Sequence, residues 1–94
     1  MKGKFDISEF VSVQTQQKVL ENLVNRFKKR RKESKISQKE LATKSGVSYG
    51  SIRRFEGSGE ISLSSLLKLA NALNSLQDFN ELFKNKIIKN LKDL

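Results

Sequence analysis

The side chains that carry most enzyme chemistry are scarce in this 94-residue chain. It has no histidine and no cysteine, so the commonest general base, thiolate nucleophiles and soft metal ligands are all missing. Its ten carboxylates are scattered singly, without the spacing of a cation-binding loop, and Gly57-Ser58-Gly59 is too short to cradle a phosphate. We therefore expect a protein that is not an enzyme and that uses no cofactor, metal ion or small-molecule ligand.

The chemistry that the chain does offer is cationic. Its net charge is +9, and the whole excess lies between Arg26 and Arg54, where eleven Lys and Arg stand against two Glu. A basic region in an otherwise neutral chain is typical of a polyanion binder, because each phosphate contact releases condensed counterions. Alone, the run Lys28 to Lys32 is equally compatible with a solvated helix face, a nuclear-localisation segment or a basic helix lying on an anionic membrane.

The elements that must position these charges are helical. Proline is absent, and apolar residues recur at three-and-four spacing, which predicts an all-α fold of five helices in one domain. No apolar run approaches the roughly 20 residues that span a bilayer, and the N-terminus does not resemble a signal peptide. We expect a cytoplasmic protein without a membrane partner.

The first 19 residues are expected to form an N-terminal arm and the start of the first helix. Residues 1–7 show no clear period and fit either a basic arm or a short strand. The helix is expected to begin at Ser8 or Ser12, both plausible caps, and to end near Lys35. Its apolar stripe consists of Leu20, Leu23, Val24 and Phe27, and the next position on that face is Arg31.

A helix-turn-helix follows within the domain expected at residues 20–83. Ser37 and Glu40 form a capping box that begins a short second helix, and Gly46 stands where a left-handed residue would end it. Ser48 is the expected cap of a third helix over residues 49–56. Two short helices joined by a glycine-containing turn are the signature of this motif.

Two further helices are expected. The fourth opens near Ser62 and is apolar over a wide face, as a core helix should be. The fifth is expected over about Leu76 to Leu94, with residues 84–94 as a helical extension beyond the domain. Its apolar stripe from Phe83 to Leu94 is a candidate dimer surface, and packing back onto its own core is the alternative.

The third helix has two distinct faces. At 100° per residue, Ile52, Phe55 and Glu56 fall on one face, and Gly50 and Arg54 lie almost opposite. The outer face is therefore polar and basic, as expected of a helix that enters the major groove of DNA.

Each outward residue has an expected role. Arg54 is the candidate for bidentate recognition of guanine, and Arg53 for a phosphate contact. Gly50 would let the backbone approach the groove floor, with Ser51 beside it. Tyr49 projects from the helix N-terminus toward base edges or, alternatively, packs against apolar neighbours.

Arg31 and Glu56 each continue the buried stripe of their own helix. A buried charge needs a partner. We therefore predict that these two residues form a structural ion pair rather than DNA contacts.

Over about residues 20–83, the sequence resembles the Cro/phage-repressor, or XRE-like, helix-turn-helix family. The resemblance is carried by the capping box at Ser37, the glycine turn and the apolar positions of the third and fourth helices, in that order. The resemblance implies a lambda-repressor-like fold and a phosphate contact by Gln38. It also implies a buried pair like Arg31 and Glu56. The full set of expected DNA contacts is Gln38, Lys39, Ser48, Tyr49, Gly50, Ser51, Arg53 and Arg54. Gly50 departs from the family pattern, because many relatives carry a base-reading side chain there.

The family resemblance leaves two functions open. The first is a transcriptional repressor that binds double-stranded DNA as a homodimer on a palindromic operator. The second is an antitoxin, similar to those that partner HipA-like kinase toxins, which binds its toxin and regulates its own operon.

Overall fold

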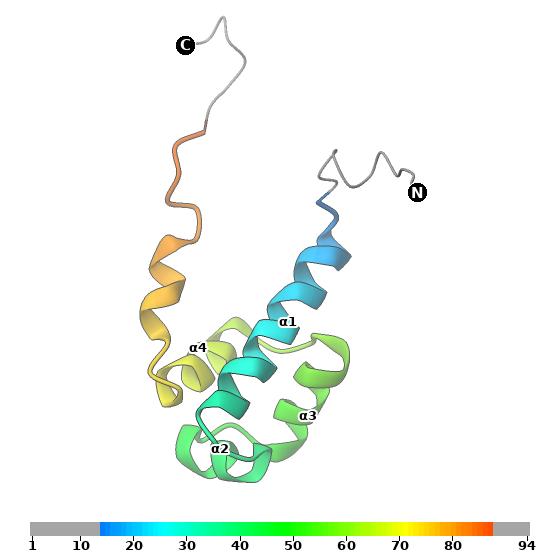
Figure 1. Ribbon diagram of the computed structural model, residues 1–94, viewed down its shortest axis with the longest axis vertical. Helices are drawn as coiled ribbons and strands as arrows, with labels where there is room; N and C mark the ends of the chain where they lie inside the picture. The colour runs from blue at the N-terminus through cyan, green and yellow to red at the C-terminus, as the bar shows by residue number, and fades with distance from the viewer. Residues whose placement is uncertain (1–13, 88–94) are drawn as a thin grey trace, which may run out of the picture.

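The computed structural model describes residues 14–87, and within them the chain is all-helical. The elements are α1 (Gln16–Glu33), α2 (Gln38–Ser45), α3 (Tyr49–Ser58), α4 (Leu63–Ala72) and the 3-10 helix η2 (Leu76–Glu81). The described part thus has five helices and no strand, which confirms the predicted fold class. The helices α2, α3 and α4 pack around one end of α1. The other end of α1 extends away from them, and η2 extends toward the same end of the molecule (Figure 1). No helix in residues 14–87 has both the length and the apolar character needed to cross a bilayer.

Serine caps define the three helices at the centre of the chain. The hydroxyls of Ser37, Ser48 and Ser62 each accept a hydrogen bond from the backbone N–H three residues on. At Ser37 the bond is reciprocal, because its own N–H donates to Glu40, so the predicted capping box is confirmed. Gly46, at φ 80°, ends α2 in the left-handed conformation expected there.

The first helix begins later than expected. Its cap is Thr15, whose hydroxyl accepts from the N–H of Lys18 at 3.0 Å, so the predicted starts at Ser8 and Ser12 are wrong. Those two serines lie outside the described residues. Leu20 is the first residue of α1 that packs against the core, little more than one turn after the cap.

The third helix is two residues longer than predicted and ends at Ser58. Gly59 closes it at φ 83°, and a Cβ at this position would lie only 2.7 Å from Leu20. The left-handed backbone conformation therefore favours glycine, and any larger residue would also have to displace the side chain of Leu20.

The core lies between α1, α3 and the pair α2 and α4. Its most deeply buried side chains are Leu41, Ile52, Phe55 and Leu69. Phe27 of α1 meets Phe55 of α3 edge to face, with ring centroids 5.0 Å apart, a favoured aromatic geometry. This contact joins α3 to α1.

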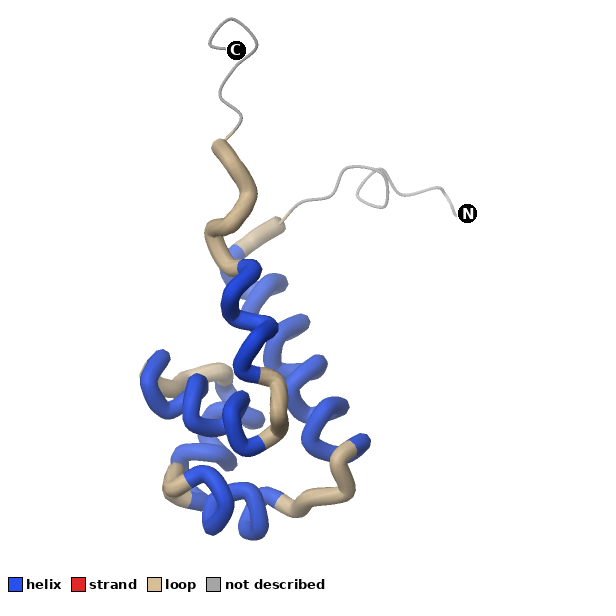
Figure 2. The backbone as a smooth tube through the Cα atoms, turned by 90° about the vertical axis from the view of Figure 1, so that its left-hand side faces the viewer, coloured by secondary structure: helices blue, strands red, loops and turns tan. Residues whose placement is uncertain are grey.

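In the described part of the chain, the predicted fifth helix is reduced to its first six residues. The chain forms one short 3-10 helix that ends at Glu81, and residues 82–87 are not helical, contrary to the expected extension from residue 84 (Figure 2). Residues 88–94 lie outside the described part. The apolar stripe has nothing to cover beyond η2, since Phe83 and Ile87 are exposed, and an amphipathic helix needs tertiary packing to persist in water.

Candidate DNA-binding interface

The outer face of α3 is open. Gly50, Arg53 and Arg54 are exposed on it, whereas Ile52 and Phe55 face the core. At the first turn, the hydroxyl of Ser48 accepts from the N–H of Ser51 and donates to its hydroxyl at 2.8 Å. The N-terminus of α3 therefore presents polar groups beside an arginine-rich face, which is the arrangement used to read the major groove.

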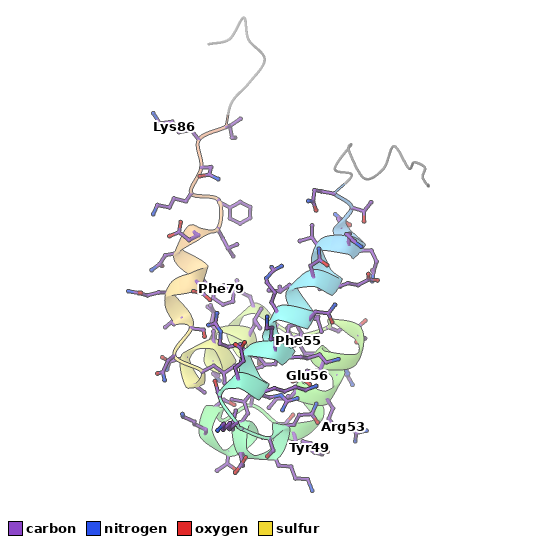
Figure 3. All side chains as sticks on the ribbon, viewed as in Figure 1. Tyr49, Arg53, Phe55, Glu56, Phe79 and Lys86 are labelled. Carbon is purple, nitrogen blue, oxygen red and sulfur yellow. The ribbon has the colours of Figure 1, made fainter. Side chains whose placement is uncertain are left out.

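Tyr49 stands between two cations. Its ring centroid is 5.5 Å from Nζ of Lys39 on α2 and 5.5 Å from the guanidinium carbon of Arg53 on α3. These distances are in the range of cation–π attraction, and the tyrosine keeps 37 % of its surface exposed. Tyr49 thus projects outward at one end of the molecule, beside Arg53, and links the basic side chains of both motif helices (Figure 3).

Arg31 and Glu56 form a bidentate ion pair. The two bonds measure 2.7 Å from Nε to Oε2 and 3.0 Å from Nη2 to Oε1, and the side chains are only 11 % and 6 % exposed. Nη1 of Arg31 also donates to the carbonyl of Ile36 at 3.0 Å. The parallel geometry of guanidinium and carboxylate fixes α3 against α1 and against the loop that leads into α2.

Gln38 completes this network, which the sequence did not reveal. Its Nε2 donates to Oε1 of Glu56 at 2.9 Å, so one carboxylate ties together α1, α2 and α3. The side-chain amide carries a second N–H, which remains for an oxygen outside the protein. No local spacing signals this contact, because the two residues are 18 positions apart and belong to different helices.

The basic run Lys28 to Lys32 does not act as one patch. Arg30 turns toward η2, where its guanidinium donates to the hydroxyl of Ser75 and lies 3.5 Å from Asp78. Ser75 in turn donates to the carbonyl of Leu73. Arg30 follows Phe27 of the buried stripe by three residues, and this spacing is the one signal that could have set it apart from its neighbours.

The capping box at the start of α2 lowers the pKa of Glu40. The backbone N–H of Ser37, and then its hydroxyl, hold the pKa of Glu40 below the ordinary value of 4.5. Hydrogen bonds to the charged carboxylate stabilise it relative to its protonated form. The capping box therefore favours the charged form of Glu40, next to Gln38 and Lys39.

The sequence matches the family model described as Helix-turn-helix over residues 27–79, more than half of the chain. The protein belongs to the Cro/C1-type helix-turn-helix family. It is a DNA-binding regulator, as members of this family are. The match covers all eight candidate DNA contacts of this helix-turn-helix protein, from Gln38 to Arg54. No curated protein and no solved structure matched the chain.

Proposed function

We propose that this regulator is a sequence-specific repressor that binds a pseudo-palindromic operator as a homodimer, with α3 in the major groove of each half-site. The observation that carries the proposal is the exposed Arg54, which lies opposite the buried Ile52 and Phe55 on a helix held by the Arg31–Glu56 pair. A base-reading side chain must be both accessible and rigidly mounted, and Arg54 meets both requirements.

The other outward residues are assigned roles around Arg54. Gln38 and Lys39 at the start of α2, together with Arg53, are suited to phosphates, which fix the orientation of the protein on the duplex. Tyr49 supports both cations.

The remaining candidates lie at the start of α3. Ser48 and Ser51 hold each other by hydrogen bonds, and Gly50 exposes bare backbone between Tyr49 and Ser51. Polar groups and backbone at this end of the helix are suited to the edges of the first bases.

The first experiment selects the sequences that the wild-type protein binds from random duplex DNA. The affinity for the best sequence and for its single-base variants is then compared between wild type and Arg54→Ala. We expect the variant to lose discrimination at one base pair per half-site, by about 1 to 3 kcal/mol. A uniform loss over all sequences would reassign Arg54 to a phosphate. If no sequence is enriched by the wild-type protein, the proposal of a specific regulator fails.

The phosphate contacts have a matched control. Each phosphate neutralised by Lys39 or Arg53 contributes about 0.9 to the slope of log affinity against log salt. Replacing either residue by alanine should reduce that slope by roughly one, whereas Lys86→Ala, at the other end of the molecule, removes the same charge without this effect (Figure 3).

One observation favours a second function, that of an antitoxin. The segment after η2 exposes Leu82, Phe83 and Ile87, which is more apolar surface than DNA binding requires. Such a surface would suit a toxin protein, with DNA binding serving to regulate the shared operon. Co-expression with the product of an adjoining or overlapping kinase or nuclease gene tests this: rescue of growth supports an antitoxin, and the absence of any rescue leaves the repressor.

A further inference from the structure

An open apolar groove lies between α1, α4 and η2. It has a volume of about 270 Å³ and is lined by Leu23 and Phe27 of α1, Leu66 of α4 and Phe79 of η2. A cavity of about 150 Å³ is enough to hold a benzene ring. The groove can therefore accept an aromatic side chain.

Beside this groove the chain exposes the kind of side chain that would fill it. Leu82 lines the rim, and the next residue, Phe83, is 102 % exposed, with Ile87 at 84 %. The backbone of Phe83 has φ 59°, in the left-handed region that residues other than glycine seldom adopt. Phe83 does not line the groove of its own chain, although its neighbour Leu82 does.

We propose that the Leu82–Ile87 segment of one copy of the protein docks into the α1–α4–η2 groove of a second copy, and that the second copy returns the same contact. The inference rests on the dimer in the proposed function and names its interface. A second copy is favoured because each chain carries both the groove and the segment, so one two-fold arrangement covers both at once.

The buried area supports this occupant. The ring of Phe83 brings roughly 200 Å² of surface, and the exposed parts of Leu82 and Ile87 add a comparable amount. Doubled by symmetry and added to the smaller area of the two grooves, the interface reaches on the order of 1,000 Å², which is the lower limit for a specific protein interface. Phe79 in the groove lies away from Tyr49 and Arg53, which stand at the lower end of the view in Figure 3, so the proposed DNA-binding face stays uncovered.

Sedimentation equilibrium of the full chain tests the proposal with Phe83→Asp, using Leu63→Asp as the matched control. Leu63 is also exposed, at 64 %, but does not line the groove. We expect Phe83→Asp to raise the dimer dissociation constant by roughly 30-fold or more, as for a central aromatic anchor, and Leu63→Asp to leave it unchanged. Equal dimerisation by Phe83→Asp and wild type, or a wild-type monomer up to about 100 μM, would overturn the interface.

Cross-linking tests the docking geometry independently of stability, because the chain has no cysteine of its own. A mixture of Lys84→Cys and Leu23→Cys copies keeps the Phe83 anchor and should form a mixed disulfide on mild oxidation, since only two different chains can bring these positions together. A mixture of Lys84→Cys and Leu63→Cys should not. Absence of the first disulfide while wild type dimerises would place the dimer contact elsewhere.

The two proposals fail in distinguishable ways. If the interface is wrong, the wild-type protein still selects specific sequences from random DNA, and Arg54→Ala still lowers its discrimination between them, whatever the effect of Phe83→Asp. If DNA recognition is wrong, Phe83→Asp still dissociates the dimer although no sequence is enriched. A monomer whose groove is filled by its own chain, or by a different protein, shows neither the dimer nor the mixed disulfide.

Discussion

Gly50→Ala separates the demands of folding from the demands of DNA binding. Gly50 lies within α3, and a Cβ built there meets no atom within 4 Å, so the substitution is sterically free in the protein. Alanine is favoured over glycine inside a helix by roughly 0.5 to 1 kcal/mol, and because Gly50 lies in the first turn of α3 we expect a gain near the lower end of this range. For a domain of this size, that gain should raise the melting temperature by roughly 2 to 4 °C.

On the selected operator the same methyl group should be harmful. If α3 enters the major groove with its first turns against the base edges, the added carbon occupies space that the bare backbone of Gly50 leaves open. We expect at least a tenfold loss of affinity, or about 1.4 kcal/mol, measured by fluorescence anisotropy at fixed salt.

Gly57→Ala is the matched control. Gly57 is also helical, also has no atom within 4 Å of a built Cβ, and lies on the same stripe as Gly50. It is two turns farther along, or about 10 Å from the N-terminal end that enters the groove. It should gain similar stability and bind the operator as well as wild type. A stabilised Gly50→Ala that retains full affinity would refute the close approach of α3 to the groove floor.

The buried pair and the capping box lead to two further predictions. Arg31→Ala should destabilise the fold by about 3 to 5 kcal/mol in a thermal melt, because it strands the carboxylate of Glu56, and the double change with Glu56→Met should recover much of the loss; a melt equal to wild type would contradict the role of the pair. Ser37→Ala should raise the pKa of Glu40 part of the way toward its ordinary value in an NMR titration, because it removes the hydroxyl but keeps the backbone N–H of residue 37, which is the larger cause of the lowered pKa. A carboxyl group whose pKa is lower in the folded than in the unfolded protein stabilises the fold at pH values above its unfolded pKa, and this contribution is lost as the pH falls through its folded pKa. The difference in unfolding free energy between wild type and Ser37→Ala should therefore narrow in acid. A difference that stays constant from pH 7 to about 3 would argue against the linkage.

Features set by neighbours in the sequence were predictable here. The caps at Ser37, Ser48 and Ser62 and the turn at Gly46 depend on interactions within a few residues, so their types and spacing are sufficient. The pairing of Arg31 with Glu56 was also accessible, because each residue interrupts an otherwise apolar stripe.

Features set by packing were not predictable. Ser8, Ser12 and Thr15 are comparable caps, and the choice of Thr15 depends on where α1 first meets the core at Leu20. The stripe after Leu76 has helical periodicity, yet a helix persists only where another element covers it, and the body of the domain ends at η2. The contacts of Arg30 with Ser75 and Asp78 join helices 45 residues or more apart in sequence, beyond any local pattern.

The network around Glu56 connects the stability of the fold to its recognition of DNA. Gln38 is held by Glu56 before DNA arrives, and a side chain already ordered avoids the roughly 0.5 to 1.5 kcal/mol that ordering it on binding would cost. Arg31 orients the same carboxylate and is itself only 11 % exposed. We therefore expect a change at Arg31 that leaves the domain folded to loosen the carboxylate that holds Gln38, and so to lower operator affinity although none of the proposed DNA contacts has been altered.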